Sequence, residues 1–192
     1  MTLAPWRSPL ARALHRNRSL VYARYVQLAT VRVDNRPANR TVVFRGFLDN
    51  TNQLKIITDA RSEKAEQIDQ NAWSEACWYF PNTREQFRLF GQLTLVRETC
   101  LDTDLLDART RSWQELSDAA RIQFAWSHPG APRENSGFNP PPPHSITPLP
   151  HFCLLLLNPT RVDHLELRGD PQNRSIYSFS DAIGWSIQAV NP

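Results

Sequence analysis

Short β-rich segments separated by polar turns recur along this chain, and they constrain its fold more than any other feature. The Asp34–Pro37 and Asp49–Asn52 stretches have the composition of turns, and the segments around them are rich in β-branched and aromatic residues. Strands are expected at residues 25–33, 40–48, 54–58, 75–80, 85–96, 152–157, 161–167, 174–179 and 184–190. This spacing predicts a mainly β (α+β) fold, an antiparallel barrel of six to eight strands rather than a doubly wound parallel sheet.

Three segments are expected to be helices that flank the barrel. The first begins with Ser8 as its cap and Pro9 at its first helical position, the second spans 62–70 with Ser62 as its cap, and the third spans 104–124. Residues 127–150 are rich in proline, glycine, serine and asparagine, and they predict an irregular loop. The whole chain, 1–192, is expected to be a single domain.

Composition excludes several classes of protein. The longest apolar run, 152–157, is far shorter than the roughly 20 residues that span a bilayer, and four arginines interrupt any secretory signal before residue 19. Three widely spaced cysteines fit a reducing cytosol, so a cytoplasmic location is expected. The five histidines show no metal-binding spacing, so no metal is expected, and the glycine motifs of classical NAD and ATP sites do not occur.

Positive charge is concentrated in the N-terminal third of the chain. Residues 1–48 contain nine arginines and one acid, Asp34, although the net charge of the whole chain is only +3. Arginine forks suit phosphates and carboxylates, so this asymmetry suggests an anionic ligand, either nucleic acid or a small phosphorylated molecule. A solvated basic face is the alternative, and no RRM, KH or zinc-finger pattern supports nucleic acid.

The segment from Ile57 to Lys64 has the composition of a phosphate site. A strand ends, a short loop carries Arg61, and a helix begins at Ser62 with Lys64 in its first turn. A helix N-terminus offers free backbone N–H groups and the positive end of the helix dipole. An ordinary capped helix with solvated charges is the alternative interpretation.

Two strands carry polar residues that a barrel core does not require. Arg40 shares a strand face with Val42 and Phe44, so it lies either at a rim or in a ligand site. Thr41, Val43 and Arg45 lie on the opposite face of that strand. Gln86 lies on an aromatic strand and could donate to and accept from the edge of a heterocycle.

Together these segments resemble the pyridoxamine 5′-phosphate oxidase-like, FMN-binding split-barrel family. Residues 28–47 resemble its first hairpin with an R-x-V-x-x-K/R-G strand, and residues 54–68 resemble its T-x-x-x-S-x-K loop and helix. Residues 86–91 resemble its Q-x-R-x-x-G strand, and 171–174 resemble the N-R pair near its C-terminus. The resemblance covers 25–96 well and 151–192 loosely.

The resemblance implies a homodimer with FMN at the subunit interface and a small-molecule substrate. The first strand would run along the flavin, the strand–loop–helix segment would hold the phosphate side, and Gln86 would reach the flavin of the partner subunit. Matched residue by residue to the family, the residues expected to bind FMN are Arg40, Thr41, Val42, Val43, Arg45, Ile57, Thr58, Arg61, Ser62, Lys64 and Gln86. Arg174 would contact the substrate.

Two departures from the family pattern limit what the resemblance implies. Glu63 stands where the family usually has an arginine directly before its lysine, and Arg61 could substitute for it. Ile176 stands where the oxidases carry a histidine that acts on the substrate. We therefore expect an FMN-binding oxidoreductase of unassigned substrate, with weak or absent oxidation of pyridoxamine phosphate. The alternatives are a non-enzymatic flavin carrier or sensor and a basic nucleic-acid-binding module.

Overall fold

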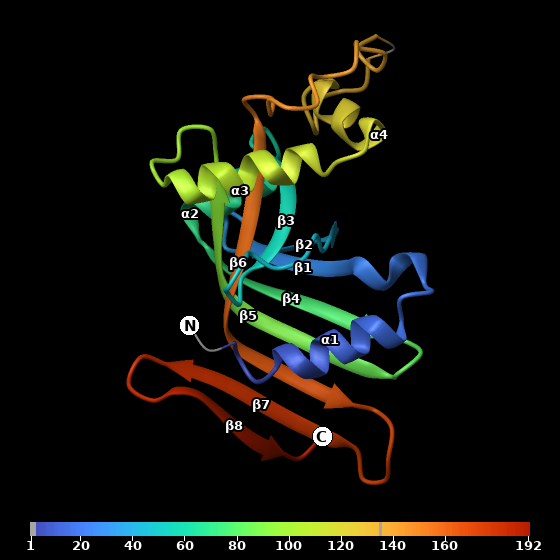
Figure 1. The fold of residues 1–192 in the computed structure, drawn as a ribbon, viewed down its shortest axis with the longest axis vertical. Helices are drawn as coiled ribbons and strands as arrows, with labels where there is room; N and C mark the ends of the chain where they lie inside the picture. Colours follow the sequence, from blue (N-terminus) through green and yellow to red (C-terminus); the bar gives the residue numbers. More distant parts are fainter. Residues whose placement is uncertain (1–2, 135) are drawn as a thin grey trace.

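The computed structural model describes residues 3–134 and 136–192, and one antiparallel sheet organises them (Figure 1). Its strands are β1 (Tyr25–Val31), β2 (Pro37–Val43), β3 (Leu54–Asp59), β4 (Trp73–Phe80), β5 (Glu85–Val96), β6 (Phe152–Glu166), β7 (Asn173–Ser180) and β8 (Gly184–Val190). Their order is β2-β1-β4-β5-β6-β7-β8, and β3 also pairs with β6. The expected antiparallel, mainly β fold is confirmed.

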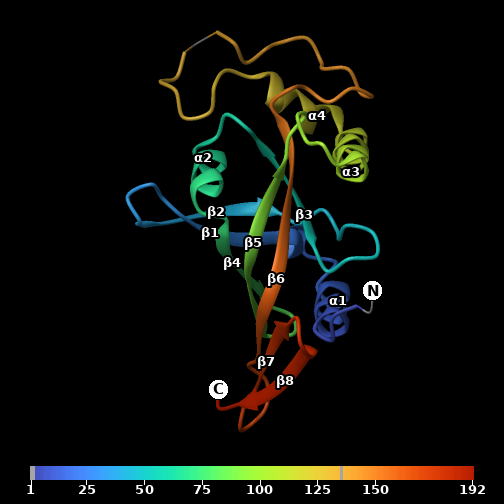
Figure 2. The same ribbon diagram turned by 90° about the vertical axis from the view of Figure 1, so that its left-hand side faces the viewer.

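The long strand β6 divides the sheet into two parts. One edge of β6 pairs with β5 along most of its length, whereas the other edge pairs with β3 over 152–157 and with β7 over 161–166. The first half therefore curls back toward β2 through β3, while β7 and β8 form a hairpin that extends away from it (Figures 1 and 2). This division gives the split barrel its form.

The expectation of two separate strands at 152–157 and 161–167 was wrong, because Pro159 does not end β6. A β-bulge at Phe90 and Gly91 shifts the register, so that Gly91 lies opposite Pro159 and Phe90 opposite Arg161. A proline is tolerated at a bulge because no ladder hydrogen bond from its nitrogen is needed there. A Cβ on Gly91 would lie 2.0 Å from the Asn158 carbonyl oxygen, so only glycine fits this crossing.

Short helices pack around the sheet. They are α1 (Arg7–Arg16), α2 (Glu63–Gln70), α3 (Thr103–Gln114) and α4 (Asp118–Arg121), with 3₁₀ turns at Val21–Arg24 and Ile122–Ala125. The first helix begins before the expected cap Ser8, because the fully buried Trp6 anchors its N-terminus. The strand expected at 40–48 is likewise displaced and lies at 37–43.

The helix expected over 104–124 is interrupted after α3. Arg121 is buried, and its guanidinium donates to the carbonyl oxygens of Trp113 and Leu116 at the end of α3. These bonds satisfy terminal carbonyls that a continuing helix would have used itself. Asp102 caps the start of α3 by accepting from the N–H groups of Asp104 and Leu105.

The core lies between the inner sheet face and the helices. Large side chains from α1, β4 and β5 fill it, and Trp6, Trp78, Phe80 and Phe87 are fully buried. Residues 127–150 form no helix or strand where they are described, as expected; residue 135 lies outside the described residues. The Trp113 indole donates to His144 O and Arg109 donates to Leu149 O, so α3 anchors this loop at the end of the molecule opposite the β7–β8 hairpin (Figure 1).

Candidate functional site

The turn from β3 into α2 gathers a lysine and two hydroxyl groups at one point. Lys64 Nζ donates to Thr58 Oγ1 at 2.9 Å and to Ser62 Oγ at 3.2 Å. Thr58 is the buried penultimate residue of β3, and Ser62 directly precedes α2 with an extended backbone. The Ser62 hydroxyl donates to Asp59 O at 2.7 Å and does not cap the helix, in contrast to the expectation. The first N–H groups of α2 are therefore left without a side-chain cap from Ser62.

Arg40 is the cation on the inner face of β2, and hydrogen bonds to neighbouring elements hold it there. Its guanidinium donates to Leu28 O at 3.2 Å, to Thr30 Oγ1 at 2.5 Å and to Gln67 Oε1 at 3.0 Å. These acceptors belong to β1 and α2, so Arg40 connects the sheet to the helix that carries Lys64. All three are neutral, and no carboxylate in the described parts of the chain forms an ion pair with Arg40.

Arg40 lies close enough to Lys64 to affect its pKa. Burial lowers the pKa of Lys64, and the positive charge of Arg40 lowers it further, while Asp59 opposes both effects. Burial also lowers the pKa of Arg40, and the negative charge of Glu63 partly offsets this lowering. The protein thus holds two partly desolvated positive charges beside the start of α2, an arrangement that favours an anion.

Arg61 is engaged differently from Lys64. Its Nε and Nη2 donate to the Asp59 carboxylate, the Nη2 bond being 2.7 Å long, and its remaining donors reach Phe124 O and Trp126 O. Burial disfavours the charged carboxylate, but hydrogen bonds from Arg61 outweigh it, so the pKa of Asp59 lies below its ordinary value. Arg61 therefore fixes the turn and connects it to the segment after α4, and its charge is largely balanced.

The other residues expected beside the flavin occupy both faces of their strands. Val42 is buried in the core, Val43 is partly buried, and Thr41 and Arg45 are exposed on the opposite face. Ile57 is partly buried and packs against the cluster around Trp113 and Phe152. The predicted alternation along 40–45 is confirmed.

Gln86 and Arg174 lie apart from this turn, on the outer face of the sheet. Gln86 lies opposite Tyr79 and Leu165 in the register, and no hydrogen bond between described residues joins it to Lys64. Arg174 of β7 makes a bidentate ion pair with Asp163 of β6, with Nε–Oδ1 at 3.0 Å and Nη2–Oδ2 at 2.7 Å. These bonds lower the pKa of the Asp163 carboxyl, although burial opposes them.

A chain of ion pairs on this outer face was not predicted from the sequence. Asp163 also lies 3.8 Å from Arg88, which in turn pairs with Glu75 at 2.9 Å. The four residues Glu75, Arg88, Asp163 and Arg174 come from four neighbouring strands. Alternation identifies each as outward-facing, but their pairing depends on the registers of β4 through β7, which the sequence does not give.

Part of the positive charge in the N-terminal third is engaged within the fold, although most of its arginines are exposed. Arg40 is used inside the fold, Arg7 packs 3.3 Å from the centroid of the Phe47 ring, and Arg18 donates to His15 O. Among the helices described, none combines the length and apolar character needed to cross a bilayer.

Comparisons with known proteins agree with this architecture. Residues 3–97 match the model of the family described as pyridoxamine 5′-phosphate oxidase, FMN-binding domain. A protein of Arabidopsis thaliana named pyridoxine/pyridoxamine 5′-phosphate oxidase 2 is 39% identical over 99% of this chain and 98% of its own length. One of Chromobacterium violaceum, named pyridoxine/pyridoxamine 5′-phosphate oxidase, is 24% identical over 87% of this chain and 78% of its own length.

Solved structures include relatives of the same fold. A pyridoxamine 5′-phosphate oxidase-related, FMN-binding protein from Nostoc punctiforme is 63% identical with a TM-score of 0.97, and the match covers all of both chains. PhzG from Burkholderia lata is 18% identical with a TM-score of 0.76 over 97% of this chain and 90% of its own, which shows a shared fold alone. This chain belongs to the pyridoxamine 5′-phosphate oxidase family and contains the FMN-binding domain of that family.

Proposed function

We propose that this protein is a homodimeric, FMN-dependent oxidoreductase in which Lys64, Thr58 and Ser62 hold the FMN phosphate. The observation that carries the proposal is the cluster at the start of α2. Within the described parts of the chain, Lys64 donates only to two hydroxyl groups, and Arg40, which lowers the pKa of Lys64, has only neutral acceptors. Asp59 and Glu63 act on these two cations only through space, and a phosphate would supply the directly bonded negative charge that neither cation has among the described residues.

The residues present fit an FMN phosphate by their donor chemistry. The Lys64 ammonium, the hydroxyl groups of Thr58 and Ser62, and the uncapped N–H groups of α2 are all donors, and the helix dipole adds its positive end. Arg61 serves in this proposal to hold the turn through Asp59, rather than as a second charge free for the phosphate. Glu63 stands where the family usually has an arginine, and it accepts a hydrogen bond from Gln67 Nε2 at 2.8 Å. This bond orients the Gln67 amide, whose Oε1 accepts from Arg40.

Bound FMN would supply the transfer of electrons to or from the substrate, and the protein would supply binding and orientation. Val43, Thr41 and Arg45 would line the flavin from the end of β2. Gln86 would donate to or accept from the ring edge of a flavin bound mainly by the other subunit.

The outer face of β4 and β5 supports a dimer. Trp73 and Phe90 stack there at a centroid distance of 5.0 Å, and both remain exposed, as does Tyr79 beside Gln86. An exposed aromatic cluster on a sheet face is typical of a surface that another protein covers. Gln86 shares this face, so a second copy seated on it would bring Gln86 close to the partner.

Subunit mixing tests the shared site. Lys64→Met and Gln86→Ala homodimers should each bind FMN weakly. If Gln86 acts across the interface, a heterodimer of the two variants contains one site with both changes and one intact site. It should therefore bind about half the wild-type amount of FMN at wild-type affinity. A heterodimer without a tight site would show that Gln86 acts within its own subunit.

Substrate choice is the second part of the proposal. The name of the Arabidopsis relative makes pyridoxine and pyridoxamine phosphates the first substrates to test. Ile176 offers no polar atom for proton transfer, and Arg174 is already paired with Asp163, so we expect weak or absent turnover of both. Steady-state oxidation on FMN-loaded protein measures this, and a kcat near the common enzyme median of about 10 s⁻¹ would contradict it.

Colour gives the simplest test of the proposed function. Purified protein should be yellow, and the released chromophore should have the mass of FMN at about one per subunit. A protein that is purified without flavin and takes up none when FMN is added would refute the function as proposed.

A further inference from the structure

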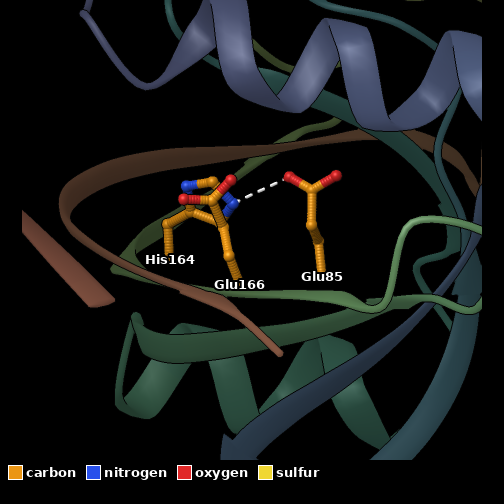
Figure 3. Close-up of side chains that lie close together, drawn as sticks. All are labelled: Glu85, His164 and Glu166. Atoms are coloured by element: carbon orange, nitrogen blue, oxygen red, sulfur yellow. Dashed lines mark hydrogen bonds and ion pairs between the residues drawn. The ribbon is translucent and has the colours of Figure 1, made fainter. Parts of the chain in front are cut away.

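Glu85, His164 and Glu166 form a cluster that the FMN site does not use (Figure 3). Glu85 begins β5, while His164 and Glu166 lie near the end of β6. One ligand-type atom from each residue lies within 4.8 Å of the other two. His164 Nε2 is 2.9 Å from Glu85 Oε2, and Glu166 approaches the same imidazole (Figure 3). Glu85 is followed by Gln86, which points to the opposite face of the strand.

The imidazole is fixed in place before any ligand arrives. His164 is only 4% exposed, and its ring stacks on Phe87 with centroids 4.0 Å apart and planes 10° apart. Glu85 is 9% exposed, whereas Glu166 is exposed. The cluster therefore combines two constrained donors with one side chain that is free to adjust.

Two carboxylates face each other here without a basic partner. Glu85 and Glu166 are direct cross-strand neighbours, and like charges in that position repel. In the described parts of the chain, no lysine or arginine forms an ion pair with either carboxylate, and His164 is the partner of Glu85. The local charge balance therefore favours a cation.

We propose that Glu85, His164 and Glu166 bind one divalent first-row transition-metal ion, for which Zn²⁺ is the test probe. An imidazole nitrogen with two carboxylate oxygens suits such an ion better than Mg²⁺ or Ca²⁺, which prefer oxygen alone. Ligand atoms on a tetrahedral zinc lie about 3.4 Å apart, given bonds of about 2.1 Å. The Glu85 and His164 atoms lie 2.9 Å apart in a hydrogen bond, so they would have to separate slightly when the metal replaces the shared proton. A rotation of the exposed Glu166 side chain would bring in the third ligand.

Such an ion would join β5 to β6 and relieve the repulsion between the two carboxylates. It would leave at least one coordination position for water, since the protein supplies three ligands. The FMN proposal does not depend on this site, because Lys64, Thr58 and Ser62 contribute nothing to it.

Calorimetric titration of Zn²⁺ into chelator-treated, tag-free protein tests the proposal. Wild type should bind one Zn²⁺ per chain, and Zn²⁺ should raise its Tm. Glu166→Gln removes one ligand from an exposed position and should keep the fold, while lowering the affinity at least about 10-fold and reducing the Tm increase. His164→Gln should abolish binding. Glu98→Gln, at an exposed glutamate outside the cluster, is the matched control and should behave as wild type.

Cobalt gives a second measurement that does not depend on stability. Co²⁺ added to wild type should produce visible absorption bands that Zn²⁺ displaces and that Glu166→Gln weakens. Zinc binding of equal affinity in wild type and Glu166→Gln would overturn the proposal, even if His164→Gln failed to fold. The absence of stoichiometric binding in wild type would overturn it as well.

Discussion

Replacing Lys64 by methionine tests the phosphate site most sharply, because methionine keeps the apolar stem and removes only the charge. Loss of a charge-assisted hydrogen bond costs about 1.5–3 kcal/mol, which is about 10-fold to 150-fold in affinity. We therefore expect the Kd for FMN to rise by that factor in calorimetric titration. Riboflavin lacks the phosphate, so its affinity should scarcely change.

The same variant should be more stable than wild type when no flavin is bound. Burial lowers the pKa of Lys64, which means that the folded state disfavours the charged lysine relative to the unfolded chain. Removing the charge removes this cost, so the Tm of the flavin-free variant should rise. Lys55→Met, at the other lysine of the chain, is the matched control and should leave FMN affinity unchanged. An equal loss of riboflavin and FMN affinity in Lys64→Met would refute the assignment.

Three further predictions follow from the fold and the turn. Gly91→Ala should lower the free energy of unfolding in urea by about 1–3 kcal/mol, because the new Cβ would lie 2.0 Å from Asn158 O. An unchanged urea midpoint would contradict the close approach of β5 and β6 at Gly91. Trp73→Glu should give a monomer in sedimentation that has lost FMN, whereas a monomer with stoichiometric FMN would disprove the shared site. Asp59→Asn should lose the stabilising ion pair with Arg61. In wild type this pair contributes to the free energy of unfolding above about pH 4, and the contribution is lost as the pH falls through the lowered pKa of Asp59. The stability gap between Asp59→Asn and wild type should accordingly close in acid melts, and a gap independent of pH would argue against the pair.

The sequence predicted most of the fold because alternation and turn composition are local signals. It located β1, β3, β5 and α2 closely, and it identified Arg40 as a cation on a core-facing strand position. Its main errors involve distant partners. Residues 152–157 and 161–167 were expected to be separate strands, but the bulge at Gly91 on another strand accommodates Pro159 within one long strand. The end of α3 depends on Arg121, whose bonds to the preceding turn no periodicity reveals.

The candidate site shows the same limit. Lys64, Ser62 and Thr58 lie within seven residues, so their meeting could be predicted from a strand, a turn and a helix start. Arg61 was expected to contact the phosphate side of FMN. Its guanidinium donates to Asp59 and to carbonyl oxygens more than sixty residues away, and the sequence does not reveal these distant partners. The cluster around His164 joins residues 79 positions apart in the chain and has no sequence signature.

A crystal structure of the FMN-loaded protein would show where the FMN phosphate binds. We predict a dimer in which the FMN phosphate lies within hydrogen-bonding distance of Lys64 Nζ and the hydroxyl groups of Thr58 and Ser62. Gln86 of the partner subunit should contact the flavin ring. A phosphate bound elsewhere, with Lys64 still donating to the two hydroxyl groups, would show that the turn from β3 into α2 is not the phosphate site.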